Sequence, residues 1–289
     1  MLRHLPPMLR AGMGQVQARV VSAVLQFGTL ALISRSVSAV SLGAFSATVS
    51  IGTVAGSVFG LGLATRALRI RRENEGGLAG PFLAVSVFGA TLAAVASTLY
   101  GTLLGSASLL AAMSASLYAA SEQVNNVAQG LLLGKGSYRG ASFFLIFRRA
   151  LPFALVLLSF LYLGPTDNVL LVAGVAYALT MVGAGIALRG EYGGFSVRRL
   201  RAAMCGSGAY WRASVWAIVP QLDVAIVNHV VGAAGAGAYS VGFRLASPIH
   251  IVTTSITSIM VPRLSAERDA AQRQSVAQPF VRSSRVYAI

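Results

Sequence analysis

The most constraining feature of the sequence is a series of eight apolar stretches, each long enough to cross a lipid bilayer as a helix. A transmembrane helix needs about 20 mostly apolar residues to cross about 30 Å of hydrocarbon. Hydrophobic residues make up 55% of the chain and charged residues only 11%, whereas soluble domains carry about 25% charged residues. The sequence therefore predicts an all-α integral membrane protein with about eight transmembrane helices, over residues 15–36, 41–64, 80–101, 106–133, 140–163, 168–188, 209–231 and 238–262.

Basic residues are concentrated in alternate connections between these stretches. One side of the predicted bundle holds 17 of the 23 Lys and Arg residues, whereas the opposite loops hold Arg35 and the acidic Asp167. Because arginine-rich loops stay in the cytoplasm, we expect a cytoplasmic N-terminus and tail. The same distribution accounts for the net charge of +15 without a nucleic-acid partner. The 17 residues are Arg3, Arg10, Arg66, Arg69, Arg71, Arg72, Lys135, Arg139, Arg189, Arg198, Arg199, Arg201, Arg263, Arg268, Arg273, Arg282 and Arg285.

A four-residue motif recurs near the start of the second and eighth predicted helices. Residues 43–46 read Gly-Ala-Phe-Ser and residues 237–240 read Gly-Ala-Tyr-Ser, and both follow a short turn after a long helix. Internal repeats are typical of transporters that are built from two related lobes. We therefore expect a six-helix lobe over residues 1–200, the start of a second lobe over residues 201–289, and a chain shorter than a complete two-lobe transporter.

Small and apolar residues around the two motifs form a wider pattern, which comprises Gln221-Leu222-Asp223, Gly232, Gly237-Ala238-Tyr239-Ser240, Arg244-Leu245, Val261-Pro262-Arg263-Leu264-Ser265, Gly43-Ala44-Phe45 and Gly62-Leu63-Ala64. This pattern resembles the polysaccharide-exporter family of lipid-linked oligosaccharide flippases. The family belongs to the multidrug/oligosaccharidyl-lipid/polysaccharide (MOP) superfamily, which includes the multidrug and toxin extrusion (MATE) transporters. The resemblance implies two six-helix lobes facing each other across a central cavity in a bacterial inner membrane.

A polar stripe runs along the fourth predicted helix. Tyr118, Glu122, Asn125 and Gln129 recur at helical spacing, so they share one face. An ionisable residue inside a span costs about 2.5–3.5 kcal/mol on insertion scales, and it therefore marks a functional site by default. Glu122 is a candidate site for ion coupling or charge balance, with Asn125 and Gln129 as candidate substrate ligands. The alternative is a hydrogen-bonded network that only holds helices together.

Two adjacent arginines, Arg148 and Arg149, lie about eight residues inside the fifth predicted helix, or roughly 12 Å deep. A guanidinium binds phosphate through two parallel hydrogen bonds and stays charged at physiological pH. Both arginines are therefore candidates to bind a diphosphate. Since neighbours on a helix point about 100° apart, one could face the cavity while the other extends toward the cytoplasm. The alternative is that both extend to the membrane surface.

The seventh and eighth predicted helices carry the remaining candidates. Arg212 and Asp223 are placed on one face with Trp216, and Pro220 between them predicts a hinge, because proline lacks a backbone N–H. Arg212 is a candidate substrate ligand, and Asp223 a candidate for ion coupling or charge balance. Arg244, near the start of the eighth helix, is a further substrate candidate.

Together with the intramembrane arginines, the resemblance implies a flippase that moves a polyprenyl-diphosphate-linked oligosaccharide for cell-surface polysaccharide synthesis. Its other partners would be membrane lipids and the polysaccharide polymerase or glycosyltransferases of the same pathway. A cation-coupled multidrug exporter is the first alternative, although arginines outnumber acids inside the spans. A membrane-embedded envelope glycosyltransferase or acyltransferase is the second, and the short external loops disfavour it. No P-loop, metal motif or nucleophile elbow occurs, so we expect neither an enzyme nor a cofactor.

Overall fold

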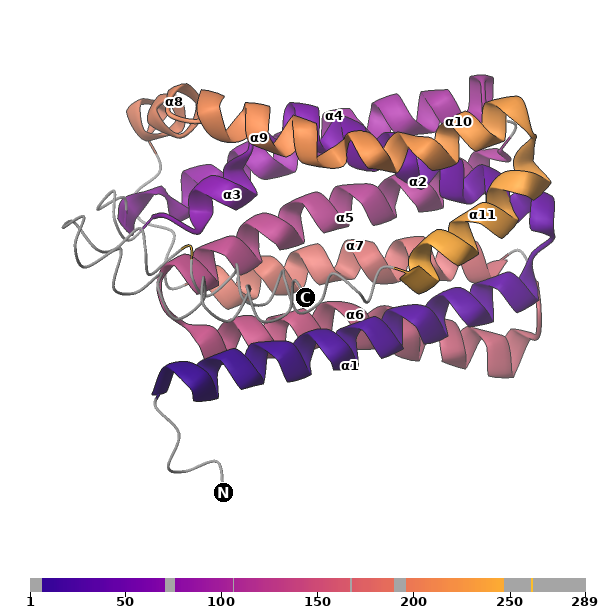
Figure 1. The fold of residues 1–289 in the computed structure, drawn as a ribbon, viewed down its shortest axis with the longest axis horizontal. Coiled ribbons are helices and arrows are strands. Elements are labelled where there is room, and N and C mark those ends of the chain that lie inside the picture. The colour runs from indigo at the N-terminus through magenta and orange to yellow at the C-terminus, as the bar shows by residue number, and fades with distance from the viewer. Residues whose placement is uncertain are drawn as a thin grey trace, which may run out of the picture.

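The computed structural model describes residues 7–70, 76–105, 107–166, 168–189, 196–246 and 261, and every regular element in these ranges is a helix. The long helices lie side by side along one direction (Figure 1), which confirms the all-α fold class. The elements are α1 (Pro7–Ser36), α2 (Ala39–Phe59), α3 (Leu63–Ala67), η2 (Gly76–Leu78), α4 (Ala79–Leu103), α5 (Leu109–Gly134), α6 (Tyr138–Leu163), α7 (Asn168–Leu188), α8 (Val197–Cys205), α9 (Gly208–Ile218), η4 (Val219–Leu222), α10 (Asp223–Val230) and α11 (Ala233–Ala246).

Five of the described helices, α1, α2, α4, α6 and α7, are long and apolar enough to cross a membrane, and α9 with α10 forms a sixth if the bent pair is one span. Helix α5 is as long as α6, at 26 residues, but its polar stripe makes it less hydrophobic. It packs against α2, α3, α4, α6 and α7. Neighbouring helices therefore shield α5 from lipid, and its polar side chains lie inside the bundle.

Two predicted spans differ from the structure. The span over residues 41–64 ends as helix α2 at Phe59, because Leu61 and Gly62 adopt positive φ angles before α3 begins. The span over residues 209–231 breaks at η4, where α9 and α10 meet at a bend of 43°. Pro220 lies in this break, as expected of a residue that cannot donate a helical hydrogen bond. The last predicted span is described only to Ala246, and residues 247–260 lie outside the described ranges.

The connections alternate between the two ends of the bundle as the charge pattern predicts. Figure 1 places α3, α8 and the start of α1 at one end, and the α10–α11 connection at the other. We call the first the arginine-rich end, because its described connections carry Arg66, Arg69, Lys135, Arg139, Arg189, Arg198, Arg199 and Arg201. The other is the arginine-poor end.

Hydrophobic packing forms two separate clusters along the bundle. One cluster lies toward the arginine-rich end and includes Leu63, Phe82 and Leu131. The other lies toward the arginine-poor end and includes Phe45 and Val169. Since buried apolar area contributes about 25 cal/mol per Å², these clusters stabilise the two ends. The polar centre of α5 lies between them.

The two copies of the repeated motif contact each other where α2 crosses α11. Ser240 Oγ lies 3.1 Å from Ser46 Oγ, and an added Cβ on Gly237 would lie 3.3 Å from the backbone nitrogen of Gly43. Equivalent residues of two related units can meet at a twofold axis, as in an isologous interface. The contact brings the two copies of the motif together, and the division into two lobes stays a prediction.

Candidate functional site

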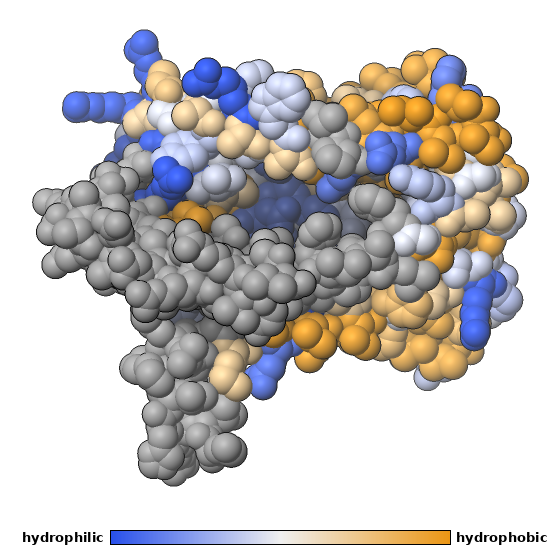
Figure 2. Space-filling model, viewed as in Figure 1, coloured by the Kyte–Doolittle hydropathy of each residue, from blue (hydrophilic) through white to orange (hydrophobic). Residues whose placement is uncertain are grey.

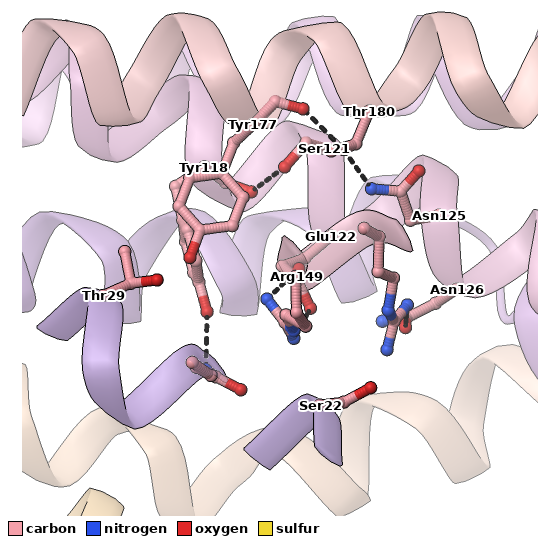
Figure 3. Close-up of polar contacts among 12 residues, drawn as sticks. Ser22, Thr29, Tyr118, Ser121, Glu122, Asn125, Asn126, Arg149, Tyr177 and Thr180 are labelled. Atoms are coloured by element: carbon pink, nitrogen blue, oxygen red, sulfur yellow. Dashed lines mark hydrogen bonds and ion pairs between the residues drawn. The ribbon is translucent and has the colours of Figure 1, made fainter. Parts of the chain in front are cut away.

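An ion pair at mid-depth in the bundle joins helices α5 and α6. Arg149 donates from both terminal nitrogens to Glu122, at 2.7 Å to Oε1 and 2.8 Å to Oε2. Figure 3 shows the two side chains converging beside Tyr118 and Asn126. Both are largely buried, with 7% and 14% of their side-chain surfaces exposed. Two parallel charge-assisted hydrogen bonds of this kind fix the guanidinium plane, and they are the geometry with which arginine also binds phosphate.

The neighbouring Arg148 also points toward α5. Its Nη1 donates to Asn126 Oδ1 at 2.9 Å, one turn along α5 from Glu122. The prediction that at least one of the two arginines extends to the membrane surface is therefore wrong: both are buried. Although their Cβ atoms diverge, the long side chains reach successive turns of the same helix.

Positive charge exceeds negative charge around this pair. Arg148 experiences the charges of Glu122, Arg149 and Arg19, so three arginines lie close to one carboxylate. A buried ion pair contributes little net stability, because desolvation offsets the Coulomb attraction. Of the three arginines, Arg148 and Arg149 are buried, and both are held by side chains of α5.

A cleft of about 360 Å³ opens over the ion pair, within the 300–1,000 Å³ typical of ligand pockets. Figure 2 shows a hydrophilic hollow near the middle of the face that it draws. Residues from α1, α2, α5, α6, α9, η4, α10 and α11 line the cleft. Most of them carry hydroxyl, amide or charged groups, namely Gln26, Ser46, Ser50, Thr53, Tyr118, Glu122, Asn126, Arg149, Gln221 and Ser240.

Tyr118 holds one wall of the cleft in place. Its Oη accepts a hydrogen bond from Gln26 Nε2 at 3.2 Å, and its ring packs edge-on against Tyr177 at 4.5 Å between centroids. These contacts join α1, α5 and α7 next to Glu122. The wall is therefore held by side chains from three helices.

The predicted stripe on α5 divides between two surroundings. Tyr118 and Glu122 line the cleft, but Asn125 and Gln129 do not. Asn125 is fully buried and donates from Nδ2 to Thr180 Oγ1 on α7 at 2.6 Å, and Gln129 is also buried. Asn125 thus fits the alternative given for the stripe, a hydrogen bond that holds two helices together.

The break at η4 separates the candidates on the seventh predicted helix. Arg212 and Trp216 lie on α9 and are exposed, whereas Asp223 begins α10 and accepts a 3.4 Å hydrogen bond from Tyr239 Oη. None of them lines the cleft. All three side chains are exposed, and the predicted hinge at Pro220 coincides with the break between α9 and α10. Arg244 lies on α11, with its side chain outside the described structure.

Sequence reasoning missed several polar residues of the cleft. Asn126 lies four residues after Glu122, so the same helical spacing could have included it. Gln26 shares a polar helical face with Ser22 and Thr29 in the sequence, whereas no local signal marks Ser50. The place of both residues in the cleft depends on contacts between distant segments.

Comparison with solved structures finds transporters that share this fold at low sequence identity. The MATE multidrug transporter DinF-BH matches with a TM-score of 0.72 and 15% identity, over 95% of this chain and 69% of its own. A MOP superfamily transporter from Pyrococcus furiosus, described by a reversed polarity of its binding pocket that suggests a different function, has a TM-score of 0.63 and 17% identity. That match covers 94% of this chain and 67% of the transporter.

A multidrug resistance MATE family transporter in an outward-facing conformation has a TM-score of 0.60 and 17% identity, over 96% of this chain and 69% of its own. No family model and no curated protein sequence matches the chain. The likeness therefore concerns the fold. With its apolar helices, the chain is a multi-pass membrane protein that has the fold of the MATE transporters of the MOP superfamily.

Proposed function

We propose that this chain belongs to a transporter of the MOP superfamily that moves a polyprenyl-diphosphate-linked oligosaccharide across a bacterial inner membrane. The observation that carries the proposal is the cleft over Arg149, most of whose lining residues are polar, with a second buried arginine, Arg148, one turn away along α5. A diphosphate is a dense anion that arginine binds through two parallel hydrogen bonds. Sugar hydroxyls need donors and acceptors at close range, and the hydroxyl and amide groups of the cleft supply them.

The ion pair defines how such a cargo would bind. Arg149 presents both terminal nitrogens to the carboxylate of Glu122, so an incoming phosphate competes with that carboxylate for the same two donors. Arg148, one turn away along α5, adds a second cation. In this proposal Glu122 balances the charge of the empty site.

A cation-coupled multidrug exporter is the second candidate, because two of the three solved neighbours described above are multidrug transporters by name. A cationic drug would require a carboxylate that can face the cleft. Among the lining residues, Glu122 is the one carboxylate, and Arg149 binds both of its oxygens. Charge therefore favours the anionic cargo. The Pyrococcus furiosus transporter, named for the reversed polarity of its binding pocket, is an example of a protein with this fold whose pocket polarity suggests a different function.

The membrane orientation is part of the proposal. We infer that the arginine-rich end faces the cytoplasm, since basic loops resist translocation. Green fluorescent protein fused after residues 77, 137 or 195 should fluoresce, and alkaline phosphatase fused at those positions should be inactive. Phosphatase fused after residues 37 or 166, at the arginine-poor end, should be active. The reverse pattern would place the arginine-rich end in the periplasm and contradict the inference.

The cargo is tested by deleting the gene and profiling both surface glycans and drug sensitivity. We expect the deletion strain to lose a surface polysaccharide, to accumulate its lipid-linked precursor, and to keep its resistance to cationic drugs. Re-expression of the chain, together with any polymerase or glycosyltransferase partner, should restore the glycan. A normal glycan profile with increased drug sensitivity would instead support the multidrug exporter.

A further inference from the structure

A short helix at the arginine-rich end lies across the direction of the long helices. Figure 1 shows α8 nearly along its own axis, whereas the long helices run across the view. In a membrane, α8 would therefore lie parallel to the surface. Hydrogen bonds hold both of its ends. Ser196 Oγ accepts from the backbone N–H of Arg199 at 3.2 Å, and Arg66 Nη1 donates to the carbonyls of Ala202 and Ala203 at 3.1 and 2.8 Å.

Arg66 anchors this helix to the first part of the chain. Its guanidinium lies 5.2 Å from the centroid of the Phe82 ring and packs so closely under Gly206 that an added Cβ there would lie 2.6 Å from Nη1. Arg66 is only 4% exposed. Because a cation also stabilises the C-terminal end of a helix, α8 is a fixed element of the surface.

The two faces of α8 differ in character. Ala203 is fully buried, and Leu200 packs against the hydrophobic cluster of the arginine-rich end. On the other face Arg198 and Arg201 are exposed, and Val197 and Met204 expose 80% and 49% of their surfaces beside them. Apolar side chains beside arginines on a helix parallel to the membrane are typical of helices that bind the headgroup region.

The start of α9, which follows α8, carries aromatic residues at the same end of the bundle. The guanidinium of Arg69 is 5.4 Å from the centroid of the Tyr210 ring. This guanidinium makes no hydrogen bond or ion pair with another described residue, and its Nε is buried without a partner. Nearby, the partly exposed Trp211 donates from Nε1 to the carbonyl of Val58 at 2.8 Å. A tryptophan at this level is typical of the membrane interface.

We propose that Arg198 and Arg201, on the exposed face of α8, form a binding surface for the headgroup of an anionic phospholipid. Among the described residues, no carboxylate forms an ion pair with these arginines, and the phosphodiester of a lipid would be their anionic partner. Val197 and Met204 would contact the upper part of the acyl chain. Anionic lipids attract basic segments next to a membrane with about 1 kcal/mol per Lys or Arg. This surface is separate from the cleft, and its proposal does not depend on the identity of the cargo.

The test is lipid binding to the purified full chain in detergent, measured by native mass spectrometry with phosphatidylglycerol and phosphatidylcholine of identical acyl chains. The wild type should bind phosphatidylglycerol in preference. R198Q/R201Q should lower that affinity about 30-fold, from about 1 kcal/mol for each of the two arginines. Phosphatidylcholine binding should not change.

A matched control is R139Q/R189Q, which removes two exposed arginines from other connections at the same end. It should leave phosphatidylglycerol binding within about twofold of the wild type. All four substituted arginines are exposed, so the melting temperatures should agree and report intact folding. Equal binding of the two lipids, or equal losses in the two double variants, would overturn the proposal.

Discussion

Replacing Arg149 with glutamine should abolish glycan export and lower the free energy of unfolding by about 3–5 kcal/mol. The loss of stability is expected because Glu122 loses both hydrogen bonds of its bidentate partner while staying inside the bundle. The loss of export is expected because the cleft loses the arginine that can bind a phosphate through two donors. Export is measured by surface-glycan profiling in the deletion strain, and stability by thermal unfolding in detergent.

The double variant R149Q/E122Q separates the two effects. Two neutral amides can bond to each other, so the double variant should recover most of the stability that R149Q loses. It should still fail to export, because Arg148 alone cannot replace a bidentate donor at the position of Arg149. Full export by the double variant would show that Arg149 serves the fold alone, and would remove the basis for an anionic cargo.

The sequence was sufficient for the membrane architecture because the bilayer imposes a local rule. Every span must be apolar over its own length, so α4, α6 and α7 begin and end within a few residues of their predicted limits. The alternation of arginines between the two ends follows from the same rule. The break in the seventh span was signalled by Pro220, although the sequence could not say that two separate helices would result.

The partners in the site could not be predicted, because they depend on how α5 and α6 pack. Glu122 and Arg149 are each notable in sequence, but they are 27 residues apart, and no local pattern joins them. Asn125 and Asn126 are adjacent and chemically identical, yet one bonds to α7 and the other to Arg148. A rotation of about 100° between neighbours on a helix decides which asparagine meets the arginine.

Replacing Gly43 with alanine should disrupt the crossing of α2 and α11 and abolish activity. The added Cβ would lie 1.6 Å from the carbonyl oxygen of Ala233, which is backbone and cannot turn away. Helix α11 would have to move off α2, and Ser240 would lose its contact with Ser46. Overpacking of this kind costs about 1–3 kcal/mol or more, which thermal unfolding and the export assay would detect together.

Gly56 provides the matched control, because it lies on the same helix and receives the same substitution. A Cβ there would lie 3.7 Å from Gln123, an ordinary contact, and alanine favours a helix over glycine by about 1 kcal/mol. G56A should therefore be neutral or stabilising. G237A should resemble G43A, since its Cβ would lie 2.7 Å from the carbonyl oxygen of Ala39. If G43A and G237A kept full stability and export, the close crossing of the two motifs would be dispensable, and the two repeats would not need to meet there.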